Sequence, residues 1–211
     1  MSFFAKIFVI NLTHRIDRRD LATKELESFC SPCDAEFFSA KYTPSHGYIG
    51  AALSHAMALS TFLFNHDENF VLILEDDFQV RDLAFFSEIH SVLSLNNWDV
   101  LLLAHNTAIP IESTTVARVC RVVNSQTLSG YVVRRSFVPK LIECFFSSAQ
   151  LLKKNLSLKE PNQSYARRIM ACDIYWKHLQ LNSIFLAVLP SAIIQRESYS
   201  DIENKIVDYG V

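Results

Sequence analysis

Short apolar runs alternate with amphipathic stretches along the first half of the chain. The apolar runs predict buried strands at residues 6–12, 34–40, 70–74 and 98–103. Apolar side chains at helical spacing predict helices at residues 17–29, 51–64 and 82–95. Such alternation is typical of an α/β fold in which helices cover both faces of a mostly parallel sheet. We therefore predict that fold class for this chain.

The second half has a less regular pattern. Residues 116–123 and 127–133 both predict strands, and their closeness in sequence predicts that they pair with each other in antiparallel fashion. The remaining predicted elements are a helix, a polar loop or lid, a second helix and a last strand, at residues 137–146, 153–164, 165–181 and 184–189. The tail, residues 193–211, has no clear periodicity. A chain of 211 residues with this pattern is most simply one domain.

Three consecutive carboxylates follow the strand predicted at residues 70–74. Glu75, Asp76 and Asp77 repel one another and are costly to remove from water. At the carboxyl end of a strand they would open into the crevice where open α/β sheets bind ligands. Because Mg²⁺ and Mn²⁺ take oxygen ligands and often bridge carboxylates to phosphates, the run is a candidate metal site for a diphosphate-bearing substrate. A solvated acidic turn explains the same residues equally well.

Composition narrows the classes of function. The chain is 50% hydrophobic and 20% charged, and its net charge of −2 gives no electrostatic basis for nucleic-acid binding. It has 4 glycines and no Gly-rich phosphate-binding motif. The N-terminal residues lack the apolar segment of a signal peptide, and no run approaches the roughly 18 apolar residues of a membrane span. We expect a cytoplasmic protein without a transmembrane segment.

Polar residues also follow the first predicted strand. Asn11, Arg15 and Arg18 could bind a nucleotide, since Arg suits bidentate contact with phosphate. The alternative is a basic helix start capped by Asp17. Basic residues in a first helical turn oppose the helix dipole, which favours the binding role. His55 lies one turn into an apolar helix, where a histidine is more often a satisfied core group than a ligand.

The second half offers two more candidates. Asp173 lies in a predicted helix among aromatic neighbours, where a carboxylate can act as a general base or be an ordinary exposed or salt-bridged residue. Gln195 begins a polar segment, residues 195–202, after the last predicted strand. This segment either folds over a bound ligand or forms an ordinary C-terminal loop.

In their order and spacing, these segments resemble glycosyltransferase family 25, which includes bacterial lipooligosaccharide galactosyltransferases and the procollagen galactosyltransferases. The matching segments run nearly end to end and are residues 9–19, 50–55, 74–77, 98–103, 129–131, 173 and 195–202. No single motif is decisive, but all occur in the family's order. The chain departs from the family at Ala51, where the family usually has Cys, and it is short, which leaves the acceptor site undefined.

The resemblance implies a GT-A fold, a single Rossmann-like α/β domain over residues 1–211. Residues 1–105 would form the nucleotide-binding half, and residues 106–211 the acceptor-side half with a closing tail. The implied reaction moves a hexose, galactose or glucose, from a UDP-sugar to an acceptor hydroxyl with inversion, as in lipopolysaccharide biosynthesis. Glu75 and Asp77 would hold a divalent metal, with Mn²⁺ preferred and Mg²⁺ as the alternative.

The resemblance also implies roles for the remaining candidates. Asp173 would be the catalytic base, and the donor would be bound by Asn11, Arg15, Arg18, Asp76 and Gln195. The acceptor would be a glycan, a lipooligosaccharide or a protein hydroxyl. Peripheral membrane association through a lipid-linked acceptor stays open, although no basic amphipathic helix supports it strongly. The alternative functions are a metal-dependent phosphohydrolase or nucleotidyltransferase, and an inactive sugar-nucleotide or carbohydrate-binding module.

Overall fold

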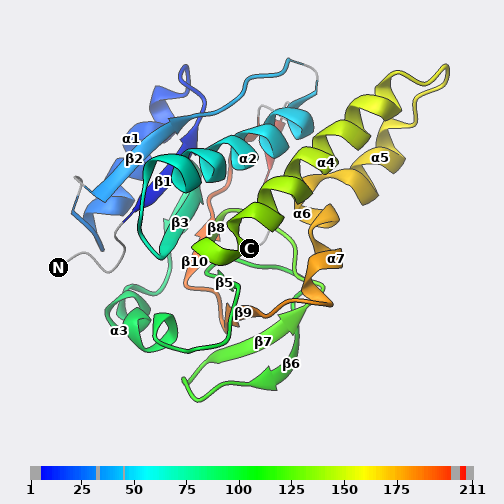
Figure 1. Cartoon of the computed structure of the whole chain (residues 1–211). Coiled ribbons are helices and arrows are strands. Elements are labelled where there is room, and N and C mark those ends of the chain that lie inside the picture. The colour runs from blue at the N-terminus through cyan, green and yellow to red at the C-terminus, as the bar shows by residue number, and fades with distance from the viewer. Residues whose placement is uncertain (1–5, 32–33, 45, 201–204, 208–211) are drawn as a thin grey trace.

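The computed structural model describes residues 6–31, 34–44, 46–200 and 205–207. One mixed sheet runs through it, with strand order β2-β1-β3-β8-β5-β9-β7-β6 (Figure 1). Its strands are β1 (Ile7–Asn11), β2 (Ala35–Ser39), β3 (Phe70–Glu75), β5 (Val100–Leu102), β6 (Ile109–Ser113), β7 (Val119–Val123), β8 (Gly130–Arg134) and β9 (Phe185–Val188). Within this sheet β8 and β7 run against the direction of the other six strands. The predicted mostly parallel α/β sheet is therefore confirmed, with two reversed strands.

Helices cover both faces of the sheet (Figure 1). They are α1 (Ile16–Glu27), α2 (Gly47–Asn65), α3 (Leu83–Leu93), α4 (Val138–Leu156), α5 (Gln163–Met170), α6 (Cys172–Tyr175) and α7 (Lys177–Gln180). Side chains along β1 alternate between two cores: Ile7 and Val9 pack with α1 and α3, whereas Phe8 and Ile10 pack with α2 and α4. Because both faces of the strand are buried, its sequence is a continuous apolar run.

Two short strand pairs lie outside the main sheet. The strand β4 (Phe78–Val80) pairs with β10 (Ile193–Gln195), and β11 (Ser198–Ser200) pairs with β12 (Lys205–Val207). The first pair sets Gln195 opposite Phe78, next to the acidic run. The tail, which has no periodicity in the sequence, is thereby tied to the carboxyl end of β3.

The first half agrees closely with its sequence pattern. Each strand and helix predicted between residues 6 and 103 is present, with ends shifted by a few residues. Helix α2 begins at Gly47, four residues before the predicted start. Asp82 caps α3 by accepting a hydrogen bond from the backbone N–H of Phe85, which explains why the helix begins where it was predicted. Strand β4 is too short to have a recognisable pattern.

The predicted pairing in the second half is wrong. Strands β7 and β8 do not form a hairpin, since β8 lies between β3 and β5 and β7 lies between β9 and β6. Burial explains the difference. The residues of β8 from Gly130 to Val133 are all buried, as suits a central strand, whereas β7 is only partly buried. The prediction relied on the closeness of the two strands in sequence and gave too little weight to the continuous apolar run of β8.

Helix boundaries in the second half also need correction. The helix predicted at residues 137–146 continues to Leu156 as α4, so the loop or lid predicted at residues 153–164 is reduced to the turn at residues 157–162. The helix predicted at residues 165–181 is divided into α5, α6 and α7. The chain is extended at Ala171, with ψ of 139°, and this residue separates α5 from α6.

Helix α2 alone, among the described helices, is long and apolar enough to cross a membrane by length and composition. Half of it is buried inside the protein, against the sheet and α4, so packing explains its apolar character. Strands from residues 1–105 and 106–211 contribute to the same sheet. The division of these halves between donor and acceptor stays a prediction, as does the cytoplasmic location.

Candidate functional site

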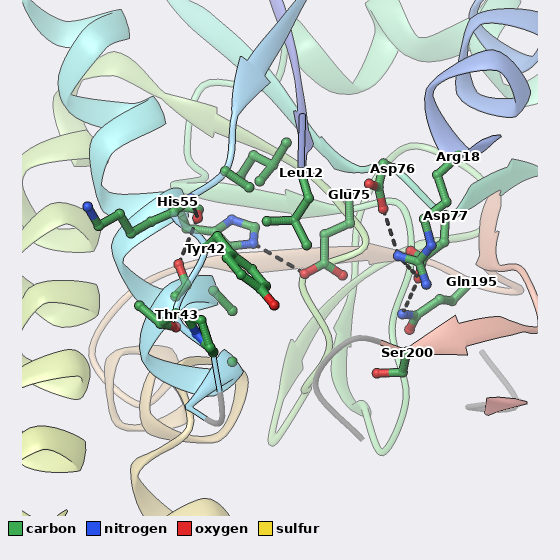
Figure 2. Close-up of a pocket in the computed structure, with 18 residues that line it drawn as sticks. Leu12, Arg18, Tyr42, Thr43, His55, Glu75, Asp76, Asp77, Gln195 and Ser200 are labelled. Carbon is green, nitrogen blue, oxygen red and sulfur yellow. Dashed lines mark hydrogen bonds and ion pairs between the residues drawn. The ribbon is translucent and has the colours of Figure 1, made fainter. Parts of the chain in front are cut away.

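A pocket of about 180 Å³ opens where β1 and β3 end. Figure 2 shows Glu75 near its middle, with Tyr42 and His55 on one side and Arg18 and Gln195 on the other. The pocket is therefore bounded by the loop after β2, by the start of α2, by the acidic run and by the tail. This is the edge of the sheet at which the sequence predicted a ligand site.

The two aspartates of the acidic run are buried rather than solvated. Glu75 ends β3, and Asp76 and Asp77 follow in the turn to β4. The side chains of Asp76 and Asp77 are 8% and 7% exposed. Burial, and then the charge of Glu75, raise the pKa of Asp77 to about 7, and burial also raises the pKa of Asp76. The interpretation of these residues as a solvated acidic turn is therefore wrong.

Asn11 and Arg18 hold Asp76 in place. The Asn11 side-chain amide donates to Asp76 Oδ2 at 2.7 Å, and Arg18 donates to Asp76 Oδ1 at 2.8 Å. Arg18 also lies 3.2 Å from Asp77 Oδ2. Asn11 is buried and lies outside the pocket lining, whereas Arg18 forms part of it. Asn11 is the last residue of β1 and Arg18 lies in the first turn of α1, and these contacts join both residues to other protein groups.

Arg18 and Arg15 also attach the tail to the site. Arg18 donates from its other terminal nitrogen to the Ser198 hydroxyl at 2.6 Å and to the Tyr199 carbonyl at 2.8 Å. Arg15 donates to the Tyr199 carbonyl at 3.1 Å and pairs with Asp17 at 2.8 Å. Arg15 does not line the pocket. Its position holds β11 beside the start of α1.

Gln195 connects the tail to Asp77, the last residue of the acidic run. Its amide nitrogen donates to Asp77 Oδ2 at 3.1 Å, while the Ser129 hydroxyl donates to its amide oxygen at 3.2 Å. The backbone N–H of Arg196 donates to the Asp77 carbonyl at 2.7 Å. Residues far apart in sequence thus fix the orientation of Asp77. The predicted closing segment extends to residue 202, and residues 201 and 202 lie outside the described residues.

Glu75 has looser contacts than the two aspartates. Its Oε1 lies 3.4 Å from His55 Nε2, and its Oε2 lies 3.4 Å from the Ser129 hydroxyl. The other ring nitrogen of His55 lies 3.1 Å from the Tyr131 hydroxyl. With its proton on Nε2, His55 accepts from Tyr131 and donates to Glu75. His55 is 1% exposed and is the satisfied core group that its apolar helix suggested, yet it also orients a pocket carboxylate.

Sequence reasoning missed the wall formed by the loop after β2. Lys41, Tyr42 and Thr43 line the pocket there. The Ser54 hydroxyl accepts a hydrogen bond from the Lys41 backbone N–H at 2.7 Å and donates to the Gly50 carbonyl at 2.7 Å. A Cβ at Gly50 would lie 2.4 Å from the Lys41 carbonyl oxygen, so only glycine allows this close approach. Gly50 and Ser54 are the residues in the sequence from which the close packing of this loop against α2 could have been inferred.

Asp173 is not among the residues that line the pocket. It stands in the first turn of α6 and is partly buried. Burial, and then the nearby charge of Glu75, raise its pKa, while Lys177 lowers it. The prediction of an exposed helix carboxylate is not what the structure has. Its assignment as a base stays a prediction.

Within the described ranges, no group of three or more His, Cys, Asp or Glu side chains is arranged to hold a metal ion. The carboxylates of Glu75 and Asp77 nonetheless suit a metal ion. Asp77 Oδ1 is buried without a hydrogen-bond partner, and the Glu75 side chain is 28% exposed. Divalent cations such as Mg²⁺ often take one or two carboxylates and complete their coordination with phosphate and water. Glu75 and Asp77 therefore have the chemistry and the free oxygen that such an ion requires.

Comparisons with known proteins bear on the fold. No family model and no curated protein matches the sequence. Among solved structures, the protein A197 from STIV has a TM-score of 0.52 at 12% identity, covering 97% of this chain and 93% of its own. A glycosyltransferase involved in the glycosylation of the major capsid of PBCV-1 has a TM-score of 0.50 at 11% identity, covering 94% and 95%. The predicted GT-A-type fold is confirmed, and membership of family 25 stays a prediction.

Proposed function

We propose that this protein is a metal-dependent glycosyltransferase that moves a hexose, galactose or glucose, from a UDP-sugar to an acceptor hydroxyl. The observation that carries the proposal is the buried Asp77 Oδ1, which has no hydrogen-bond partner and stands next to Glu75 at the end of β3. Two adjacent buried aspartates beside a third acid lower stability, and such costs persist mainly at functional sites. The glycosyltransferase fold supports a transferase at the level of architecture.

The acidic run would meet the diphosphate of the donor. Glu75 and Asp77 would hold Mn²⁺, or Mg²⁺ in its place, and the bound ion would neutralise the charge that develops on the leaving UDP. Gln195 orients Asp77, and His55 orients Glu75. Asp76, fixed by hydrogen bonds, would contact the ribose or the donor sugar.

The two walls of the pocket would bind the rest of the nucleotide. Arg18 lines one wall, and the half-exposed ring of Tyr42 offers an aromatic face on the other. Arg15 and Asn11 would act from behind, by holding β11 and Asp76. Ser200, on β11, also lines the pocket, so the tail can exclude water from the donor and limit its hydrolysis.

Asp173 would take the proton from the acceptor hydroxyl. Direct displacement with inversion requires one general base, and a base works best when its pKa is near the working pH. Burial and Glu75 shift the pKa of Asp173 in that direction. Asp173 would act from α6, outside the lining of the pocket that would hold the nucleotide.

Calorimetric titration with UDP tests the metal site. For the wild-type protein we expect MnCl₂ to increase UDP affinity strongly. Asp77→Ala should remove that increase, with a loss of affinity on the order of 100-fold, because one of the two coordinating carboxylates is gone. Asp20→Ala, which removes an exposed acid on α1, is the matched control and should behave as wild type. Equal UDP affinities for Asp77→Ala and wild type in the presence of Mn²⁺ would refute the proposal.

The products separate this function from its alternatives. A thermal-shift panel of UDP-, GDP- and CDP-sugars, each with and without Mn²⁺, first identifies the donor. Incubation of that donor with acceptor sugars should then release UDP and form a new glycoside. Release of inorganic phosphate or pyrophosphate instead would indicate a phosphohydrolase or a nucleotidyltransferase. Binding with no product from any acceptor would favour the inactive module.

A further inference from the structure

We propose that the tip of the α4–α5 hairpin docks on a membrane surface that carries anionic phospholipid. The hairpin tip is defined here as residues 153–170, from the last turns of α4 through α5. Figure 1 shows α4 and α5 side by side, extending beyond the rest of the protein to a connecting turn. A projecting segment of this kind can contact a flat surface such as a membrane while the rest of the protein stays clear of it.

The hairpin tip is strongly basic in an acidic protein. It contains Lys153, Lys154, Lys159, Arg167 and Arg168 and one acid, Glu160, which gives a net charge of +4. The whole chain has a net charge of −2, so the rest of it carries −6. The three lysines and Arg168 are exposed, and no ion pair joins them to any acid among the described residues. A surface of this charge is complementary to an anionic one.

Exposed apolar side chains lie among these cations. Leu158 is 51% exposed in the connecting turn, and Tyr165 and Ile169 are 55% and 43% exposed on α5. Tyr165, Arg168 and Ile169 have the spacing of one helix face. Cations interleaved with aromatic and aliphatic groups suit the interface of a bilayer, where the former meet phosphate and the latter enter the acyl boundary. A nucleic acid or an anionic glycan would use the charge but leave the apolar groups exposed to water.

The hairpin tip adjoins the donor pocket. The Arg167 guanidinium lies 4.6 Å from the centre of the Tyr48 ring, at the start of α2. Gly47, which precedes Tyr48, lines the donor pocket. A membrane bound at the hairpin tip would therefore lie near the site. This placement suits a lipid-linked acceptor. That consequence rests on the proposed function, whereas membrane binding itself is independent of it.

Vesicle flotation of the whole protein tests the proposal without donor or metal. We expect binding to vesicles of phosphatidylcholine with about one-third phosphatidylglycerol, and little to phosphatidylcholine alone. Replacing Lys153, Lys159 and Arg168 by Gln should lower partitioning at least tenfold, toward about 100-fold if each contributes about fivefold. The matched control replaces Lys24, Lys140 and Arg81, also two exposed lysines and one exposed arginine, by Gln. It should change partitioning less than twofold.

The apolar contribution has its own matched pair. Leu158→Ser with Ile169→Ser should lower partitioning several-fold, whereas Leu181→Ser with Ile111→Ser, at positions elsewhere that are at least as exposed, should not. Circular dichroism and UDP affinity should match wild type in every variant, since none of these residues lines the donor pocket. Equal binding to neutral and anionic vesicles, or equal losses in the two charge variants, would overturn the proposal. A donor-binding failure would leave this result unaffected.

Discussion

The pocket at the acidic run and the hairpin tip are two charged regions of opposite sign, and they differ most in burial. The pocket encloses Asp76 and Asp77 at 8% and 7% exposure and binds them through Arg18, Asn11 and Gln195. The hairpin tip leaves its three lysines and Arg168 exposed to water. Buried charges depend on one another for orientation and stability, whereas solvated charges contribute mainly long-range attraction. A change in the pocket should therefore affect binding and folding together, and a change in the hairpin tip should affect surface binding alone.

The largest effect should come from Asp173→Asn, which tests whether the pocket's chemistry extends to α6. We expect transfer to acceptor sugars to fall by roughly 10²- to 10⁴-fold, because general-base catalysis contributes that much. UDP affinity should stay within about twofold, since Asp173 does not line the pocket. UDP release with and without acceptor, measured beside Asp20→Asn, checks this. A variant with full transfer activity would exclude Asp173 as the base.

Arg18→Gln should have the next largest effect, on stability. It leaves two buried carboxylates without their cation, and breaking a buried pair from one side costs about 3–5 kcal/mol. Urea unfolding measures this free energy. Arg168→Gln, in the hairpin tip, should change it by less than about 0.5 kcal/mol. Similar losses in the two variants would mean that burial does not distinguish the two regions.

The smallest effect tests an uncharged contact of the pocket wall. Ser54→Ala removes the acceptor of the Lys41 backbone N–H and should lower the free energy of unfolding by about 1 kcal/mol. Ser60→Ala is the control, because Ser60 makes the same hydrogen bond to the preceding turn of α2, at 2.8 Å to the Ala56 carbonyl, without a loop partner. UDP affinity should fall for Ser54→Ala alone. An equal loss for Ser60→Ala would assign the effect to the helix rather than to the loop.

Much of the first half could be predicted because local pattern and tertiary burial agree there. Strand β3 is apolar on both faces and ends at three acids, so the strand and its functional end are visible together. Strand β8 shows where this agreement stops. Its partners are β3 and β5, far away in sequence, and nothing local to residues 127–133 identifies them.

The candidate site was only partly predictable for a similar reason. Glu75, Asp77 and Gln195 were identified from their places after strands and from a resemblance. Their mutual contacts required the tail to return beside β4, a pairing of strands too short for periodicity to reveal. Lys41 and Tyr42 lie in a loop whose position is fixed by Ser54, and loop position has no pattern in sequence. In the hairpin tip, the predicted loop began too early, at residue 153, because the polar residues at the end of α4 outweighed their helical spacing, whereas residues 157–162 do form the connecting turn.

The central claim is that Glu75 and Asp77 hold a cation that in turn binds a nucleoside diphosphate. A crystal soaked with UDP and MnCl₂, with data collected at the manganese absorption edge, tests it most directly. The account predicts an anomalous peak within coordination distance of carboxylate oxygens from Glu75 and Asp77, about 2.0–2.6 Å for hard divalent cations, and of the diphosphate. A bound UDP whose phosphates lie away from both carboxylates, with no peak beside them, would contradict it.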